Sequence, residues 1–303
     1  MKFANRSKYA LDEPFLVKSN EPIYKYLSFF QLVDMLENKK LYLQKVGLWD
    51  DPSEGSGYVS FHEYVFTKAT GATVDPVVSD DEFRKSVKKR YPFGTSWSFL
   101  PESDAMWRIY SQDKMGIQIQ TTVEKLEGVL SMSEFPKEQI LIVKTQLADR
   151  GCSAEVLNRY SEIERYFDMK YVVGRVVYSP TDNRNNITFD QSDLNGSLSE
   201  HAHFEEFLKK REAFKHEEEV RGLVNFFSDN INSRGNSLSC QWTIEDIMIA
   251  LTKEKKSHAP IDNNFIEAVK IDPRADDWVV QTIKSYCESK KITNVERSDL
   301  YGK

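Results

Sequence analysis

Several features that mark other classes of protein are missing from this chain of 303 residues. Its three cysteines are odd in number and contain no Cys-x-x-Cys pair, so no disulfide framework can be completed and reduced thiols are expected. No window approaches the roughly 18 apolar residues of a membrane-spanning helix, and the first residues lack the apolar core of a secretory signal. These absences predict a cytoplasmic protein without membrane contact.

A surplus of positive charge is also missing. The 41 Lys and Arg residues face 47 Asp and Glu residues, which gives a formal net charge of −6. A general binder of nucleic-acid phosphates is usually basic, so this balance disfavours such a role while leaving a local basic patch open.

The common motifs of cofactor binding and catalysis are absent as well. There is no G-x-G-x-x-G, no G-x-x-x-x-G-K-[ST] and no G-x-S-x-G. His201 and His203 are two residues apart in a predicted helix, where they point to different sides, and no H-E-x-x-H accompanies them. The acidic run 50–54 lacks the calcium-loop pattern, and we interpret it as a turn in which Asp51 bonds its own backbone. No metal site is predicted.

What is present is an ordinary globular composition, 40% hydrophobic and 29% charged, in a chain long enough to bury a core. Neither a repeat nor a linker divides it. Side-chain periodicity predicts short strands interrupted by helices, which favours a mixed or antiparallel sheet in an α+β fold. The predicted strands are 23–27, 41–43, 94–99, 115–120, 171–178, 217–227, 244–251 and 268–271. The predicted helices are 29–39, 81–89, 103–111, 154–169, 198–214 and 274–288.

The predicted helix 103–111 has a clear packing face. Ser103 is a plausible N-terminal cap, and Met106, Trp107 and Tyr110 recur on one side. We expect Trp107 and Tyr110 to hold this helix on the sheet.

The strongest chemical pattern lies in the predicted strand 217–227. Its apolar residues alternate, so Glu217, Glu219 and Arg221 would share the opposite face, with the two carboxylates about 7 Å apart. Arg221 would then keep Glu219 ionised. The alternative is a solvated edge of charges.

Two further strands carry polar or aromatic residues that suit a ligand. In strand 94–99, Ser96 and Ser98 share one face and Trp97 takes the other, which fits either a polar ligand or a wet surface. In strand 23–27, Lys25 stands next to Tyr26, where a cation can meet a phosphate and a ring can stack. The alternative for this second pattern is a half-buried edge strand.

The order of these three patterns resembles that of the ADP-ribosyltransferases with an arginine, serine, glutamate triad. That family has arginine in its first strand, Ser-Thr-Ser in a middle strand and Glu-x-Glu near the end, with an apolar strand after the serines. Here Lys25 or Tyr26 would stand for the arginine, 96–98 for the serine motif and 217–219 for the acidic motif, with 116–120 as the following strand.

A second resemblance covers nearly the whole chain. The runs Y-K-Y, DDPSEG, S-W-S, S-x-x-M-W-x-x-Y, M-G-I-x-I, E-x-E-x-R and I-D-P-R-A-D-D-W are similar to a bacterial family catalogued as domain of unknown function number 2971. Together the resemblances imply a single ADP-ribosyltransferase-like domain over 1–303, with a split mixed or antiparallel sheet and helical insertions at about 60–92 and 125–170.

The resemblance to the transferases also implies an activity, the transfer of ADP-ribose from NAD⁺ as substrate. Glu219 would hold the ribose and oppose the positive charge that develops as nicotinamide leaves, Glu217 would orient the acceptor, and Ser96, with Ser98 as its backup, would fix Glu219. The remaining ligand contacts would come from Lys25, Tyr26, Trp97, Tyr110 and Arg221.

Several alternatives stay open at this point. The acceptor is protein, RNA or DNA, and an antitoxin partner is expected if the enzyme is a toxin or a phage-defence effector. The alternatives to a transferase are an NAD glycohydrolase, a hydrolase of another glycosidic bond, and a non-catalytic module that binds a nucleotide or a partner protein.

Overall fold

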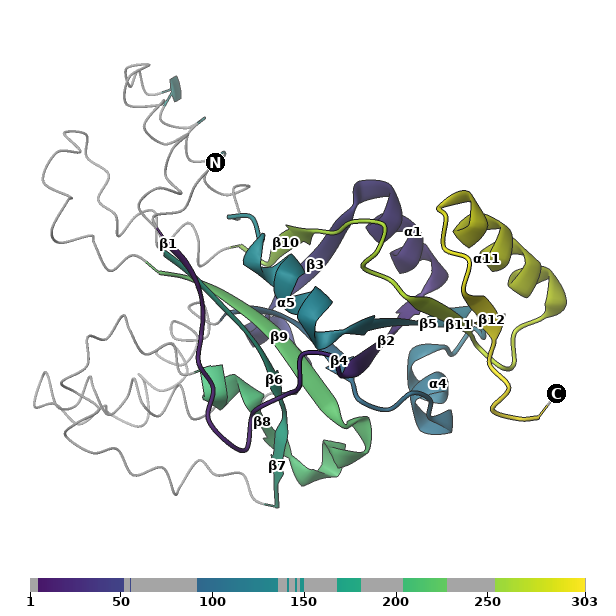
Figure 1. The fold of residues 1–303 in the computed structure, drawn as a ribbon, viewed down its shortest axis with the longest axis horizontal. Helices are drawn as coiled ribbons and strands as arrows, with labels where there is room; N and C mark the ends of the chain where they lie inside the picture. Colours follow the sequence, from purple (N-terminus) through teal and green to yellow (C-terminus); the bar gives the residue numbers. More distant parts are fainter. Residues whose placement is uncertain are drawn as a thin grey trace, which may run out of the picture.

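The computed structural model describes residues 5–51, 55, 92–135, 141, 145, 148–149, 168–180, 204–227 and 254–302. Within them, helices pack on a mixed ten-stranded sheet, so the predicted α+β class is confirmed (Figure 1). The helices are α1 (Phe29–Asn38), α4 (Asp104–Tyr110), α5 (Val123–Ser131) and α11 (Asp277–Ser289), with 3-10 turns η1 (Val46–Leu48), η4 (Phe204–Leu208) and η5 (Glu212–Glu217). None of the described helices combines the length and apolar character needed to cross a lipid bilayer.

The main sheet runs in the order β1-β6-β9-β4-β2-β5-β11-β12, and β3 connects β10 to β4. Its strands are β1 (Asn5–Lys8), β2 (Pro22–Ser28), β3 (Lys40–Lys45), β4 (Phe93–Ser98), β5 (Gly116–Thr122), β6 (Asp168–Arg175), β9 (Glu219–Phe227), β10 (Lys256–Pro260), β11 (Ala268–Ile271) and β12 (Val295–Arg297). A separate pair joins β7 (Val177–Ser179) to β8 (Lys209–Arg211).

The sheet is split next to β4. Strand β2 meets β4 at the single pair Tyr24–Ser98, while β3 pairs with the other end of β4 at Phe93 and Gly94. Between these two contacts β2 and β3 diverge, and α1 connects them. Ser28 caps α1 in a reciprocal capping box with Gln31, and Lys39 ends it in a left-handed conformation.

Most sequence-predicted elements in the described ranges are present. Helix 103–111 is confirmed as α4, and the Ser103 hydroxyl accepts from the Met106 N–H as predicted. The predicted strand 171–178 is wrong in its bounds, because the chain is extended from Asp168 and breaks at Val176, whose N–H donates to the Glu219 carbonyl. Because β6 begins at Asp168, residues 168 and 169 are in a strand, and the predicted helix 154–169 is wrong at its end.

The predicted helix 198–214 is wrong over its described part. Residues 204–214 form η4, β8 and the start of η5. Phe204, Phe207 and Leu208 are buried in one cluster, so tertiary packing overrides the helical pattern of charges.

The predictions for 81–89 and 244–251 lie outside the described residues, and the insertions at 60–92 and 125–170 lie largely outside them. The single-domain assignment stays a prediction. Strands β1, β8, β10 and β12 were not predicted, and α5 was not predicted as a separate helix.

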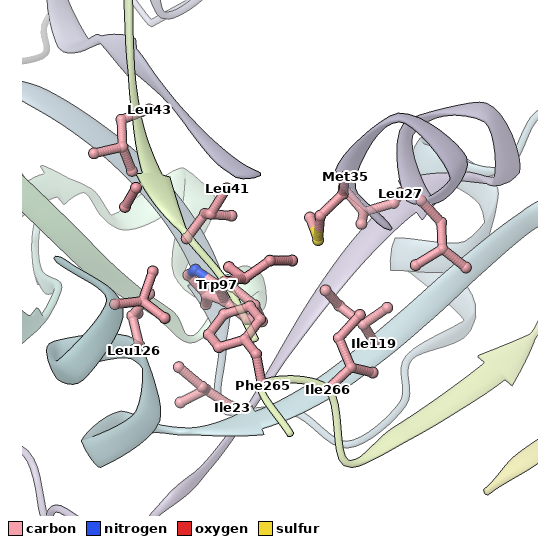
Figure 2. Close-up of a cluster of buried hydrophobic side chains, with 14 of the residues drawn as sticks. Ile23, Leu27, Met35, Leu41, Leu43, Trp97, Ile119, Leu126, Phe265 and Ile266 are labelled. Carbon is pink, nitrogen blue, oxygen red and sulfur yellow. The ribbon is translucent and has the colours of Figure 1, made fainter. Parts of the chain in front are cut away.

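One face of the sheet carries the main hydrophobic core. Side chains from α1, α5 and α11 pack there on alternate residues of β2, β4, β5 and β9. Trp97 lies in this core, edge-to-face with Phe265 at 5.9 Å between ring centroids, and Figure 2 shows it among Leu41, Ile23 and Phe265.

The other face is covered in two separate places. Phe204, Phe207 and Leu208 of η4 pack on Val172 and Leu223. Further along, α4 packs Met106 and Trp107 on Tyr26, on the side of the sheet away from α1 and α11 (Figure 1). By strand order, the polar residues of β4 and β9 on this face lie between the two apolar clusters. We call this band, with the side chains that contact it, the polar seam. It comprises Ser96, Ser98, Glu219 and Arg221 of the sheet, Lys210 and Glu217, which are linked to Glu219 by ion pairs, and Tyr178.

The I-D-P-R motif anchors the end of α4. The Arg274 guanidinium donates to both oxygens of Asp272 and to the carbonyls of Trp107 and Ser111. At the other end of the helix, the Trp107 indole N–H donates to Glu102. The segment after β11 therefore holds α4, and with it Tyr110, in place.

Replacing Trp107 with alanine should destabilise the protein strongly. The ring has no exposed area, so Trp107→Ala should lower the free energy of unfolding by roughly 3–5 kcal/mol. Ile109→Ala is the matched control, because Ile109 is on the same helix but 49% exposed, and should cost about 0.5 kcal/mol. Urea unfolding of both variants measures the difference. Equal losses would contradict the packing role of Trp107.

Candidate functional site

The structure brings the three sequence motifs together on neighbouring strands. The first motif lies on β2, the serines on β4 and Glu219 on β9, and these strands are adjacent in the sheet. Ser98 pairs with Tyr24 on one side and with Glu219 on the other, and Ser96 pairs with Arg221. Paired residues point to the same face, so Tyr24, and Tyr26 two residues on, lie on the face of Ser98 and Glu219. Lys25 pairs with the core residue Ile119 and therefore starts from the opposite face.

Glu219 is the centre of the seam and is only 3% exposed. Arg221 binds its carboxylate in a two-pronged pair, with Nε 2.8 Å from Oε1 and Nη2 3.0 Å from Oε2. The Lys210 ammonium lies 3.0 Å from Oε2. Ser96 is near enough to contribute to the lowered pKa of the Glu219 carboxyl, and its proposed role in fixing that carboxylate stays a prediction.

Arg221 holds this carboxylate from inside the protein. Its side chain has no exposed area, its Nη1 donates to the Phe207 carbonyl at 2.6 Å, and its guanidinium lies 4.6 Å from the centre of the Trp49 ring. A group in this position orients Glu219, and it does not reach a ligand at the surface.

The charge state of Glu219 follows from these contacts. Burial by itself raises the pKa of a carboxyl group, but the charges and hydrogen bonds of Arg221 and Lys210 outweigh it and lower the pKa of Glu219 to about 2. The carboxylate is thus ionised at neutral pH, as the sequence predicted from Arg221.

Glu217 is not on the strand, so its predicted place on one strand face with Glu219 is wrong. It ends η5, and Glu218 then takes a left-handed conformation at φ 41° before β9 begins. Lys210 nevertheless joins the two carboxylates, because its Nζ lies 2.7 Å from Glu217 Oε2 as well as 3.0 Å from Glu219 Oε2.

Lys25 approaches β4 from the core face, at the split in the sheet. Its Nζ donates to the Ser96 carbonyl at 2.8 Å, where β2 and β4 have parted, and stands 5.7 Å from the centre of the Trp97 ring. Burial lowers the pKa of Lys25 to about 8, and the charge of Glu219 partly opposes that shift. Of the two candidates for the missing arginine, Lys25 is the one that lies within the field of Glu219.

The aromatic candidates separate into two groups. Tyr26 and Tyr110 stack with ring centroids 6.0 Å apart, and Trp107 packs edge-on against Tyr26 at 4.9 Å. Tyr110 is 48% exposed, and its pKa is raised by burial and by the charge of Glu217, so its hydroxyl lies at the edge of the seam. Trp97 is in the core on the opposite face, so the structure does not bring it to the seam.

The Ser98 hydroxyl stabilises the turn before β9 and, among the described residues, makes no hydrogen bond to the Glu219 side chain. Its hydroxyl donates to the Glu217 carbonyl at 2.7 Å and accepts from the Leu100 N–H at 3.0 Å. Asp51 accepts two hydrogen bonds from Arg211 of β8, which ties the acidic turn to the strand that carries Lys210.

Sequence reasoning missed two residues of the seam. Lys210 was assigned to a predicted helix. The sequence feature that could have pointed to it is the basic run 209–211, which comes shortly before the acidic run 217–219 and could pair with it. Tyr178, whose hydroxyl accepts from the Glu219 N–H at 2.8 Å, is 41 residues away in the chain and gave no local signal. In the described part of the chain, no three His, Cys, Asp or Glu side chains gather to hold a metal ion.

Comparison with known proteins supports the family resemblance. Residues 106–222 match the model of a family described as protein of unknown function (DUF2971), which confirms the second resemblance of the sequence over those residues. The match begins inside α4, at Met106, and includes Glu217, Glu219 and Arg221, while β2 and the serine motif precede it. It does not address the ADP-ribosyltransferase motif order. No significant match was found among curated proteins or among solved structures.

The ionised Glu219 should make stability depend on pH in acid. Its folded pKa of about 2 lies below its ordinary value of 4.5, so its contribution is present above pH 4.5 and is lost as the pH falls towards 2. The full contribution is roughly 3 kcal/mol. The difference in unfolding free energy between the wild type and Glu219→Gln should therefore shrink between pH 5 and pH 2.

Glu218→Gln is the control for this titration. It removes the same charge from the neighbouring residue, which is exposed. Urea unfolding at several pH values should give a wild-type-to-variant difference that stays near zero for Glu218→Gln. A difference for Glu219→Gln that does not change with pH would contradict the lowered pKa.

Proposed function

We propose that this protein is an ADP-ribosyltransferase that uses NAD⁺ as its substrate. The observation that carries the proposal is the meeting of Lys25, Ser96 and Glu219, from motifs far apart in the sequence, on three adjacent strands beside a split in the sheet. The chain order of these motifs resembles that of the transferases.

The chemistry suits an ionised carboxylate in a fixed orientation. When the bond between nicotinamide and the ribose anomeric carbon breaks, its electron pair leaves with nicotinamide and positive charge develops on the ribose. Glu219 would oppose that charge, with no reorientation needed because the two-pronged pair with Arg221 already holds it. The acceptor then bonds to the anomeric carbon and loses its proton, so the products are ADP-ribosyl acceptor, nicotinamide and a proton.

Glu217 and three residues near Glu219 suit the acceptor and the rest of the substrate. The side chain of Glu217 is 15% exposed, against 3% for Glu219, so Glu217 is the carboxylate better placed to meet an acceptor. The exposed ring of Tyr110, supported from behind by Tyr26, would stack on nicotinamide. Lys25 would balance the pyrophosphate charge.

One observation favours a second candidate, a module that binds a nucleotide without catalysis. The oxygens of Glu219 are already occupied by Arg221 and Lys210, so a ribose hydroxyl must displace the ammonium to reach the carboxylate. An NAD glycohydrolase would use the same seam with water as acceptor. A cytoplasmic role as a toxin or phage-defence effector, with an antitoxin partner, stays a prediction of the family resemblance.

Removing the charge of Glu219 tests the transferase proposal. Glu219→Gln keeps the shape of the side chain and should reduce nicotinamide release by about 10²–10³-fold, because the lost charge acts mainly in the transition state. NAD⁺ affinity, measured by calorimetry, should change much less. Glu218→Gln, the neighbouring exposed carboxylate, should leave both quantities unchanged.

The results separate the candidates. Binding of NAD⁺ without nicotinamide release in the wild type would favour the non-catalytic module. Full nicotinamide release by Glu219→Gln, with its fold intact, would remove the seam as the reaction centre. Glu217→Gln should reduce labelling of an acceptor more than it reduces nicotinamide release, because water can replace a badly oriented acceptor.

A further inference from the structure

Lys210 lies where a positively charged group would bind the two carboxylates of the seam. Its Nζ is 2.7 Å from Glu217 Oε2 and 3.0 Å from Glu219 Oε2, and its side chain is only 9% exposed. We infer that Lys210 occupies the position of a cationic acceptor and thereby restricts the acceptor to an uncharged nucleophile. This inference rests on the proposed function.

The charges of the seam are already balanced without a substrate. Glu217 and Glu219 supply two negative charges, and Lys210 and Arg221 supply two positive charges. Burial lowers the pKa of Lys210 by itself, but the charges of Glu219 and Glu217 outweigh it and raise the pKa, so the ammonium keeps its charge. With Lys25 close by, a guanidinium or ammonium acceptor would meet repulsion and no unpaired carboxylate.

The position of Lys210 is built into the fold. Strand β8 pairs residue by residue with β7, and Phe207 and Leu208 just before it are buried. Arg211, the next residue, is bound to Asp51. The Phe214 ring lies 4.6 Å from the Lys210 ammonium, which adds a cation–π contact. Lys210 is thus a resident of the seam and differs from its exposed neighbour Lys209, which pairs with Glu206.

An uncharged nucleophile meets a different environment. Glu217 Oε2 holds Lys210, while Oε1 has no hydrogen-bond partner among the described residues. A hydroxyl, amide or ring N–H can donate to that oxygen without adding charge. As its oxygen or nitrogen bonds to the ribose anomeric carbon, the nicotinamide bond breaks with its electron pair and the acceptor proton passes to Glu217 and then to water.

The first experiment measures whether a cation fits when Lys210 is removed. Methylguanidinium is titrated into the wild type, Lys210→Ala and the matched control Lys209→Ala, and binding is followed by calorimetry and melting temperature. Lys210→Ala should bind methylguanidinium at least roughly tenfold more tightly than the other two proteins. Equal affinity in all three, or binding by the wild type that Glu217→Gln abolishes, would overturn the inference.

The second experiment measures the acceptor directly. Agmatine, a guanidinium compound, is incubated with NAD⁺ and each protein, and ADP-ribosyl-agmatine is detected by mass spectrometry beside nicotinamide release. The wild type and Lys209→Ala should release nicotinamide without labelling agmatine, and Lys210→Ala should label it. Labelling of agmatine by the wild type would overturn the inference.

A second variant and a binding readout that does not depend on activity keep the inference testable. If Lys210→Ala loses its fold by circular dichroism, Lys210→Gln keeps most of the side-chain length and a hydrogen-bond donor while removing the charge, and the same comparisons apply to it. If the wild type releases no nicotinamide with any acceptor, the proposed function fails. The methylguanidinium titration then still decides whether Lys210 fills a cation position.

Discussion

The buried pair between Arg221 and Glu219 is the interaction on which the rest of the site depends. Two charges that are 0% and 3% exposed are stable only if each is paired and hydrogen-bonded, and removing one partner of such a pair typically costs about 3–5 kcal/mol. The surrounding contacts meet this demand. Lys210 donates to the carboxylate, the Arg221 guanidinium donates to the Phe207 carbonyl, and the Trp49 ring lies against the guanidinium. The positions of β4, η4 and β8 are therefore linked to one ion pair on β9.

The layout of the sheet explains why a polar seam exists at this place. Alternate residues of β4 and β9 enter the main core on one face, and their neighbours face the other side, where η4 and α4 each cover a separate apolar cluster. The strip between the two coverings lies beside the split that lets Lys25 reach the Ser96 carbonyl. The fold thus gathers charged groups from three strands, β2, β8 and β9, between the two apolar clusters.

Local patterns predicted the parts of this site that depend on strand alternation. The faces of Ser96, Trp97 and Ser98 and the approach of Arg221 to Glu219 follow from a period of two, and Ser103 was a correct helix cap. Local patterns failed where the chain departs from a regular element or where contacts span a long distance in sequence. Glu218 turns left-handed, which removes Glu217 from the strand, and charges at helical spacing concealed the extended segment of Lys210. The extended segment of Lys210 follows directly after the buried Phe207 and Leu208, and the charge pattern does not reveal that burial.

The most direct test of this account is the titration of the Glu219 carboxyl group itself. Carbon-13 NMR of protein labelled at glutamate side-chain carboxyls, with the Glu219 signal assigned by its loss in Glu219→Gln, follows its ionisation through acid pH. The account predicts that this carboxyl stays ionised as the other glutamates titrate and gains its proton only near pH 2, while the protein remains folded. A Glu219 signal that titrates near pH 4.5 in the folded protein would contradict the pair as the centre of the site.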